Sequence, residues 1–124
     1  MAYAHSFDAD RKLILVVQSE GENYYKEMLD WMMAVRTDPA FSRGYGILCD
    51  FRDGTVQLSP TDAFTCGTIL QYFFAGQKVA FVIPDGLKPM VEKQVLAVHT
   101  ALEVRGFALL QDAENWLSSG GRSG

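Results

Sequence analysis

The sequence predicts a single α/β domain, in which a mixed, mostly parallel sheet of about five strands is covered by about four helices. Short, continuously apolar runs such as "LILVV" and "VAFVI" alternate with longer segments of helical periodicity. Such apolar runs are typical of parallel strands that are buried on both faces. The chain has 124 residues, which suits one domain. We expect this domain over residues 1–118, followed by a flexible Gly/Ser tail over residues 119–124.

Five segments are expected to form the sheet. Residues 3–7 and 12–18 flank the turn sequence "DADR" and predict a hairpin. The apolar runs at 45–51 and 78–83 predict two further strands, and "FALLQ" at 107–111 predicts the last one. Because crossovers between parallel strands are right-handed, few arrangements of these strands are possible.

Four segments have the apolar spacing of helices. They lie within residues 20–39, 59–76, 84–106 and 113–117, and Pro39 is expected to end the first helix near Arg36 or Thr37. In the second segment Ser59 is expected to cap the helix, Pro60 fits the first helical position, and Gly76 is a plausible stop. Gly106 is expected to end the third helix, and Asp112 to cap the last one.

Composition and charge narrow the class of partner. Lys and Arg number 11 against 15 Asp and Glu, so the formal net charge is −4 and no basic cluster occurs. This argues against nucleic acid as the partner. The apolar runs are shorter than the ~20 residues that a membrane span needs. The start "MAYAHSFDADRK" lacks the pattern of a signal peptide, so we expect a cytoplasmic protein.

The sequence offers no motif for a metal or a cofactor. Cys49 and Cys66 lie in an apolar strand and a helix, without a CxxC pair or a His-rich tract, and are interpreted as small buried hydrophobic residues. His5 and His99 are interpreted as ordinary surface or boundary residues. No Walker loop, nucleophile elbow or GxGxxG follows any strand. We therefore expect no metal, no cofactor and no catalytic residue.

Four stretches carry a resemblance to a known family. They are the opening hairpin that leads into "LILVVQSEG", the strand "ILCDFRD", the helix start "LSPTDAF" and the ending "GFALLQDAENWL". In this order, over residues 3–118, they resemble STAS domains and the small bacterial SpoIIAA-like proteins related to them. The resemblance implies a STAS/SpoIIAA-like fold and a non-enzymatic module that binds a partner protein around the start of the second helix.

The same resemblance implies a phosphoacceptor at the docking surface. In such domains a partner kinase phosphorylates a serine at the start of the second helix, and the added charge disrupts docking. The family segment usually reads Asp-Ser-Ser-Gly, whereas this chain has "LSPTD". Ser59 and Thr61 are the hydroxyl residues that fall at the matching place.

Polar residues gather where the central strand leads into the second helix. The carboxyl ends of parallel strands are the usual ligand edge of an open α/β sheet, and helix N-termini favour anions. The residues expected to bind a partner or a ligand are Asp50, Arg52, Asp53, Ser59, Thr61 and Asp85.

These residues also have plain structural interpretations. Asp50 and Arg52 are two positions apart on a strand and can pair, and Asp53 with Gly54 is a common turn pair. Ser59 can act only as a helix cap. An enzyme is the third alternative, with Asp50 or Asp53 as a general base and Arg52 holding an anion.

A second candidate surface is apolar. Three consecutive aromatic residues of the second helix cannot all face one core, so at least one should be exposed or meet another chain. We interpret this set as part of the core or a homodimer surface. The alternative function is a small apolar-ligand or lipid carrier, because some relatives resemble CRAL-TRIO lipid-transfer domains. The residues of this apolar pocket or dimer surface are Met28, Met32, Phe64, Tyr72, Phe73 and Phe74.

Overall fold

The computed structural model describes residues 3–18, 21–23, 25–52, 54–56, 59–83 and 103–120. Its strands are β1 (Tyr3–Asp8), β2 (Leu13–Gln18), β3 (Gly21–Asn23), β4 (Gly46–Asp50), β5 (Gly54–Val56), β6 (Lys78–Val82) and β7 (Glu103–Phe107). Its helices are α1 (Tyr25–Thr37), α2 (Pro60–Phe74) and α4 (Leu110–Gly120). The predicted α/β class is confirmed within these ranges.

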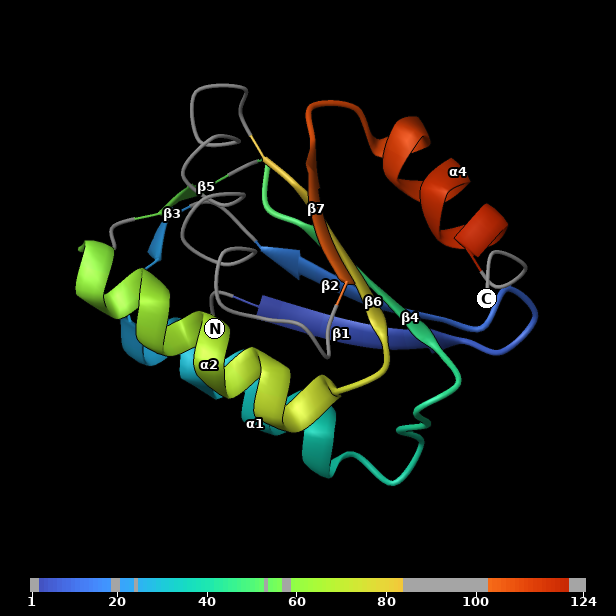
Figure 1. The fold of residues 1–124 in the computed structure, drawn as a ribbon, viewed down its shortest axis with the longest axis horizontal. Helices are drawn as coiled ribbons and strands as arrows, with labels where there is room; N and C mark the ends of the chain where they lie inside the picture. Colours follow the sequence, from blue (N-terminus) through green and yellow to red (C-terminus); the bar gives the residue numbers. More distant parts are fainter. Residues whose placement is uncertain are drawn as a thin grey trace.

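Five strands form one mixed sheet in the order β1-β2-β4-β6-β7. The opening hairpin pairs β1 with β2 antiparallel, and each of the other neighbouring pairs is parallel. The predicted hairpin and the two central strands are therefore confirmed. The parallel strands all run toward the side of the molecule where α2 begins (Figure 1).

Helices cover both faces of the sheet, as its continuously apolar strands require (Figure 1). Because side chains alternate along a strand, Ile47 and Cys49 join the core cluster under α1 and α2. Leu48 faces the other way and packs in a smaller cluster with Ala113 and Leu117 of α4. α1 and α2 thus lie against one face and α4 against the other.

The last strand lies earlier than predicted. β7 occupies Glu103–Phe107 instead of 107–111, and Gly106 is a buried residue of this strand rather than the stop of a helix. Exposed and buried residues alternate along it, which is the period of a strand. Leu110 begins α4, since Leu110, Ala113 and Leu117 recur at helical spacing and pack in one cluster.

Three further details differ from the predictions or lie outside the described ranges. β3 and β5 form a second, two-stranded parallel sheet, so Gly21–Asn23 is not part of the first helix. Glycine and asparagine are poor helix formers, which is consistent with a start of α1 at Tyr25. α4 continues to Gly120, beyond the expected domain end at residue 118. Residues 84–102 of the predicted third helix lie outside the described residues.

Candidate functional site

The polar end of β4 is organised by one ion pair. Arg52 Nε donates to Asp50 Oδ1 and Arg52 Nη2 donates to Asp50 Oδ2, each at 2.8 Å. The Arg52 backbone N–H also donates to Asp50 Oδ1, at 3.4 Å. The side-chain hydrogen bonds from Arg52 hold the pKa of Asp50 below its ordinary value. The guanidinium group thus keeps this carboxylate ionised.

The start of α2 is capped by an exposed serine. Ser59 has extended backbone angles, and its Oγ accepts a hydrogen bond from the Asp62 backbone N–H at 3.1 Å. Pro60 follows as the first helical residue, so the predicted cap is confirmed. Thr61 is also exposed, and its carbonyl accepts from Thr65 Oγ1 at 3.0 Å. Two hydroxyl groups therefore lie in solvent at a helix N-terminus, where an anion is favoured.

The structure describes only part of the predicted site. Asp50 and Arg52 are in direct contact, and Ser59 and Thr61 share the first turn of α2. β4 runs toward the side on which this turn lies (Figure 1). Asp53 and Asp85 lie outside the described residues.

Exposed residues continue from this corner along one side of α2. Thr61, Phe64, Thr68 and Tyr72 are exposed and recur every three or four positions, so they share one face of the helix. Phe64 is 46% exposed and Tyr72 is 80% exposed. The helix therefore presents a face with two exposed aromatic residues, the first of which lies five residues after the Ser59 cap.

The other residues of the predicted apolar set are at least partly buried. Met28 is 7% exposed, and Met32 and Phe74 are fully buried in the core. Phe73 is partly buried and packs against the same core cluster. Burial removes Met32 and Phe74 from any dimer surface, whereas Phe64 and Tyr72 remain accessible.

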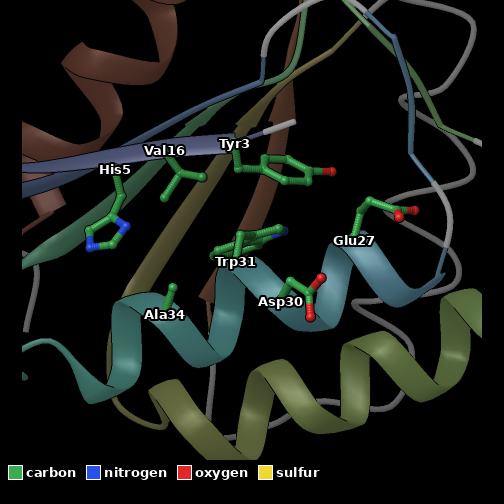
Figure 2. A pocket seen from close by; sticks show the side chains of 7 residues that line it. All are labelled: Tyr3, His5, Val16, Glu27, Asp30, Trp31 and Ala34. Atoms are coloured by element: carbon green, nitrogen blue, oxygen red, sulfur yellow. The ribbon is translucent and has the colours of Figure 1, made fainter. Parts of the chain in front are cut away.

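A groove between β1 and α1 was missed by the sequence analysis. It has a volume of about 150 Å³ and is shown in Figure 2. Seven residues line it: Tyr3, His5, Val16, Glu27, Asp30, Trp31 and Ala34. The alternation of Tyr3 and His5 on β1, and the helical spacing of Glu27 and Ala34 on α1, were visible in the sequence. The packing of β1 beside α1, which brings them together, was not.

The described residues include no cluster of metal ligands and no helix that could span a membrane. Cys49 and Cys66 are both free and buried. Burial raises the pKa of the Cys66 thiol to about 11 and raises that of Cys49 well above its ordinary value. No group of three metal-ligating side chains occurs in the part of the chain that the structure describes. No helix within these ranges is both long and apolar enough to cross a bilayer.

The sheet order and the placement of the helices define an α/β protein with a SpoIIAA-like fold. The chain is similar to the solved structure of an uncharacterised protein of the DUF3478 family from Shewanella loihica PV-4, described as having a SpoIIAA-like fold. The TM-score is 0.60, the sequence identity is 16%, and the match covers 94% of this chain and 92% of that one. At this identity the likeness shows the fold alone. No model of a known family matches the sequence, and no curated protein matches it.

Proposed function

We propose that the protein is a non-enzymatic, cytoplasmic binding and regulatory module that docks a partner protein around the start of α2. The observation that carries this proposal is the exposed Ser59 hydroxyl at the N-cap of a 15-residue helix. Phe64, five residues further along the same helix, is 46% exposed. A hydroxyl that can be modified, at Ser59, and an exposed aromatic side chain, at Phe64, thus lie at the same end of α2. This arrangement suits a surface that binds and releases a protein.

Phosphorylation at this place would add charge without breaking the helix. A phosphate carries about −1.5 to −2 charges at neutral pH, and the amides of the first helical turn favour it. Ser59 is our first choice as acceptor, with Thr61 as the second, because both are exposed. The added charge would act on docking, since Phe64 follows Ser59 by five residues and Thr61 by three residues on the same helix.

The lowered pKa of Asp50 supports a binding role over a catalytic one. A general base works best when its pKa is near the working pH. Arg52 instead lowers the pKa of Asp50 and occupies both of its carboxylate oxygens. This pair can offer charge to a partner but is poorly suited to accept a proton at neutral pH.

The test is a comparison of partner capture by matched variants. Cross-linking in cells, followed by mass spectrometry and affinity measurement on the captured partner, would use the wild-type chain, Ser59→Asp, Phe64→Ser and Ser118→Asp. Ser118 is exposed on α4, on the other side of the sheet, so its variant controls for added charge. We expect Ser59→Asp and Phe64→Ser to lose the partner and Ser118→Asp to retain it.

Two results would contradict the proposal. Equal partner affinity for Ser59→Asp and the wild-type chain would remove the phosphoswitch. Equal affinity for Phe64→Ser would remove the docking surface on α2. Circular dichroism of each variant establishes that a lost partner is not the result of a lost fold.

A further inference from the structure

The groove between β1 and α1 combines aromatic walls with an acidic rim. Tyr3 comes from the edge strand β1, and Glu27, Asp30 and Trp31 come from α1. The ring centroids of Tyr3 and Trp31 are 6.3 Å apart. Figure 2 shows the Trp31 indole beneath the Tyr3 ring, with its nitrogen end on the side of Glu27. The groove is distant in sequence from the docking surface on α2 and uses none of its residues.

The Trp31 indole carries a buried hydrogen-bond donor that finds no acceptor in the part of the chain that the structure describes. Its residue is only 2% exposed, and its indole Nε1 has no hydrogen-bond partner among the described residues. Other polar groups of the groove are engaged, since Tyr3 Oη donates to Met28 Sδ at 3.5 Å and His5 Nε2 lies 2.9 Å from Asp38 Oδ2. A buried donor that stays unpaired is costly. The indole N–H therefore favours a ligand that carries an oxygen acceptor.

The charges around the groove select the kind of ligand. Glu27 and Asp30 both line the groove. Lys26 Nζ lies 3.5 Å from Asp30 Oδ2, and the Lys26 side chain is 81% exposed. Carboxylates at the rim attract a cation and repel an anion. Aromatic rings such as that of Tyr3 also attract cations. A carboxylate or phosphate is therefore a poor match for the Trp31 N–H, and a neutral oxygen is a good one.

We propose that this groove binds a small organic cation in which an ammonium group is joined by a short link to a neutral oxygen, that is, an amino alcohol or its ester. The volume of about 150 Å³ suits such a molecule, because a cavity of about this size holds one of benzene size. A lysine side chain of a protein is a poorer fit, since its end has a charge but no oxygen acceptor for the Trp31 indole.

Choline and two analogues test each half of this recognition. 3,3-Dimethylbutan-1-ol has the shape and hydroxyl of choline without its charge, and tetramethylammonium has the charge without the hydroxyl. The ¹H–¹⁵N NMR signal of the Trp31 indole N–H reports the new hydrogen bond, and that of Trp116 on α4 is the internal reference. We expect choline to shift the Trp31 signal and to bind about tenfold more tightly than either analogue.

Variants separate recognition from folding. Glu27→Gln combined with Asp30→Asn removes the charge of the rim while changing only side chains that are at least partly exposed. We expect this variant to bind choline about tenfold more weakly. Asp112→Asn, on the exposed side of α4, is the matched control and should bind as the wild-type chain does. Trp31→Phe should lose the preference for choline over tetramethylammonium, in protein that circular dichroism shows to be folded.

We expect a free amino alcohol and not a lipid headgroup, because the choline oxygen of phosphatidylcholine carries an anionic phosphate, which the acidic rim repels. Phosphatidylcholine vesicles should therefore not sediment the protein, and sedimentation that is lost in the Glu27→Gln/Asp30→Asn variant would contradict the predicted repulsion of anions. Binding of free choline without sedimentation identifies a free amino alcohol. The proposal is overturned if free choline does not bind, or if the neutral analogue binds as tightly as choline.

Discussion

Arg52 holds the carboxylate of Asp50 by both oxygens, through two hydrogen bonds of 2.8 Å. The two residues are only two positions apart, and they form this pair where the chain leaves β4. The side chain of Asp50 is 20% exposed and that of Arg52 is 45% exposed. The pair is therefore partly screened by solvent, and its expected contribution to stability is that of a surface ion pair with good geometry.

Arg52→Ala should lower the free energy of unfolding by about 0.5–1 kcal/mol at pH 7. The pKa of Asp50 is lowered in the folded chain, so the pair stabilises the protein above the unfolded pKa of about 3.9 and loses this effect as pH falls through the folded value. Urea unfolding of wild type and variant should therefore differ at pH 7 and converge at the lowest pH at which the protein folds. A difference that stays constant with pH would show that Arg52 acts by packing instead.

Ser59→Ala should destabilise the protein by about 1 kcal/mol, because the backbone N–H of Asp62 loses its acceptor. Ser59→Asp keeps a capping oxygen and should unfold at nearly the wild-type urea concentration. Urea unfolding followed by circular dichroism measures both. Equal losses of about 1 kcal/mol from the alanine and aspartate variants would mean that an aspartate at this position does not replace the serine cap, and that Ser59→Asp is unsuitable for the docking test.

The parts of the fold that the sequence predicted are those determined by local pattern. β2, β4 and β6 are apolar at consecutive positions, and burial on both faces of a sheet accounts for that. The last strand was predicted wrongly because "FALLQ" is as apolar as a strand. In the structure Leu110 belongs to a helical stripe, and the less apolar "EVRGF" pairs with β6. Which residues form the last strand depends on pairing with β6, which is distant in sequence. A short stretch of sequence around the segment does not show this pairing.

The same distinction applies to the sites. The Asp50–Arg52 pair and the Ser59 cap join residues two and three positions apart, so spacing alone predicted them. The groove joins Tyr3 to Trp31, which come from an edge strand and a helix and meet only when β1 packs beside α1. No short motif links them, and only the tertiary arrangement reveals the indole N–H that has no partner among the described residues.

Cys49 and Cys66 should resist alkylation in the folded protein. Burial raises the pKa of Cys66 to about 11, so about a thousandth of it is thiolate at pH 8, against about a quarter for an ordinary thiol. Cys49 is fully buried and its pKa is raised as well. Iodoacetamide at pH 8, followed by intact mass spectrometry, should modify neither thiol rapidly until urea unfolds the chain. Fast modification of Cys66 in the native protein would indicate that α2 opens locally.

Phe74 and Tyr72 provide a matched pair on one helix. Phe74 is fully buried, stacks on Trp31 with ring planes 7° apart, and also contacts Phe41. Tyr72 is 80% exposed. Phe74→Ala should therefore cost about 3–5 kcal/mol, through lost burial and the cavity left behind. Tyr72→Ala should change stability by no more than about 0.5 kcal/mol.

Urea unfolding monitored by tryptophan fluorescence measures both variants, because Trp31 lies against Phe74. If Phe74→Ala is unfolded without urea, Phe74→Leu gives a smaller loss in a folded protein. Similar losses from the two alanine variants would mean that Tyr72 is covered in solution, as it would be in a homodimer. Sedimentation equilibrium of the wild-type chain distinguishes that case, since a dimer that buries Tyr72 should dissociate in the Tyr72→Ala variant.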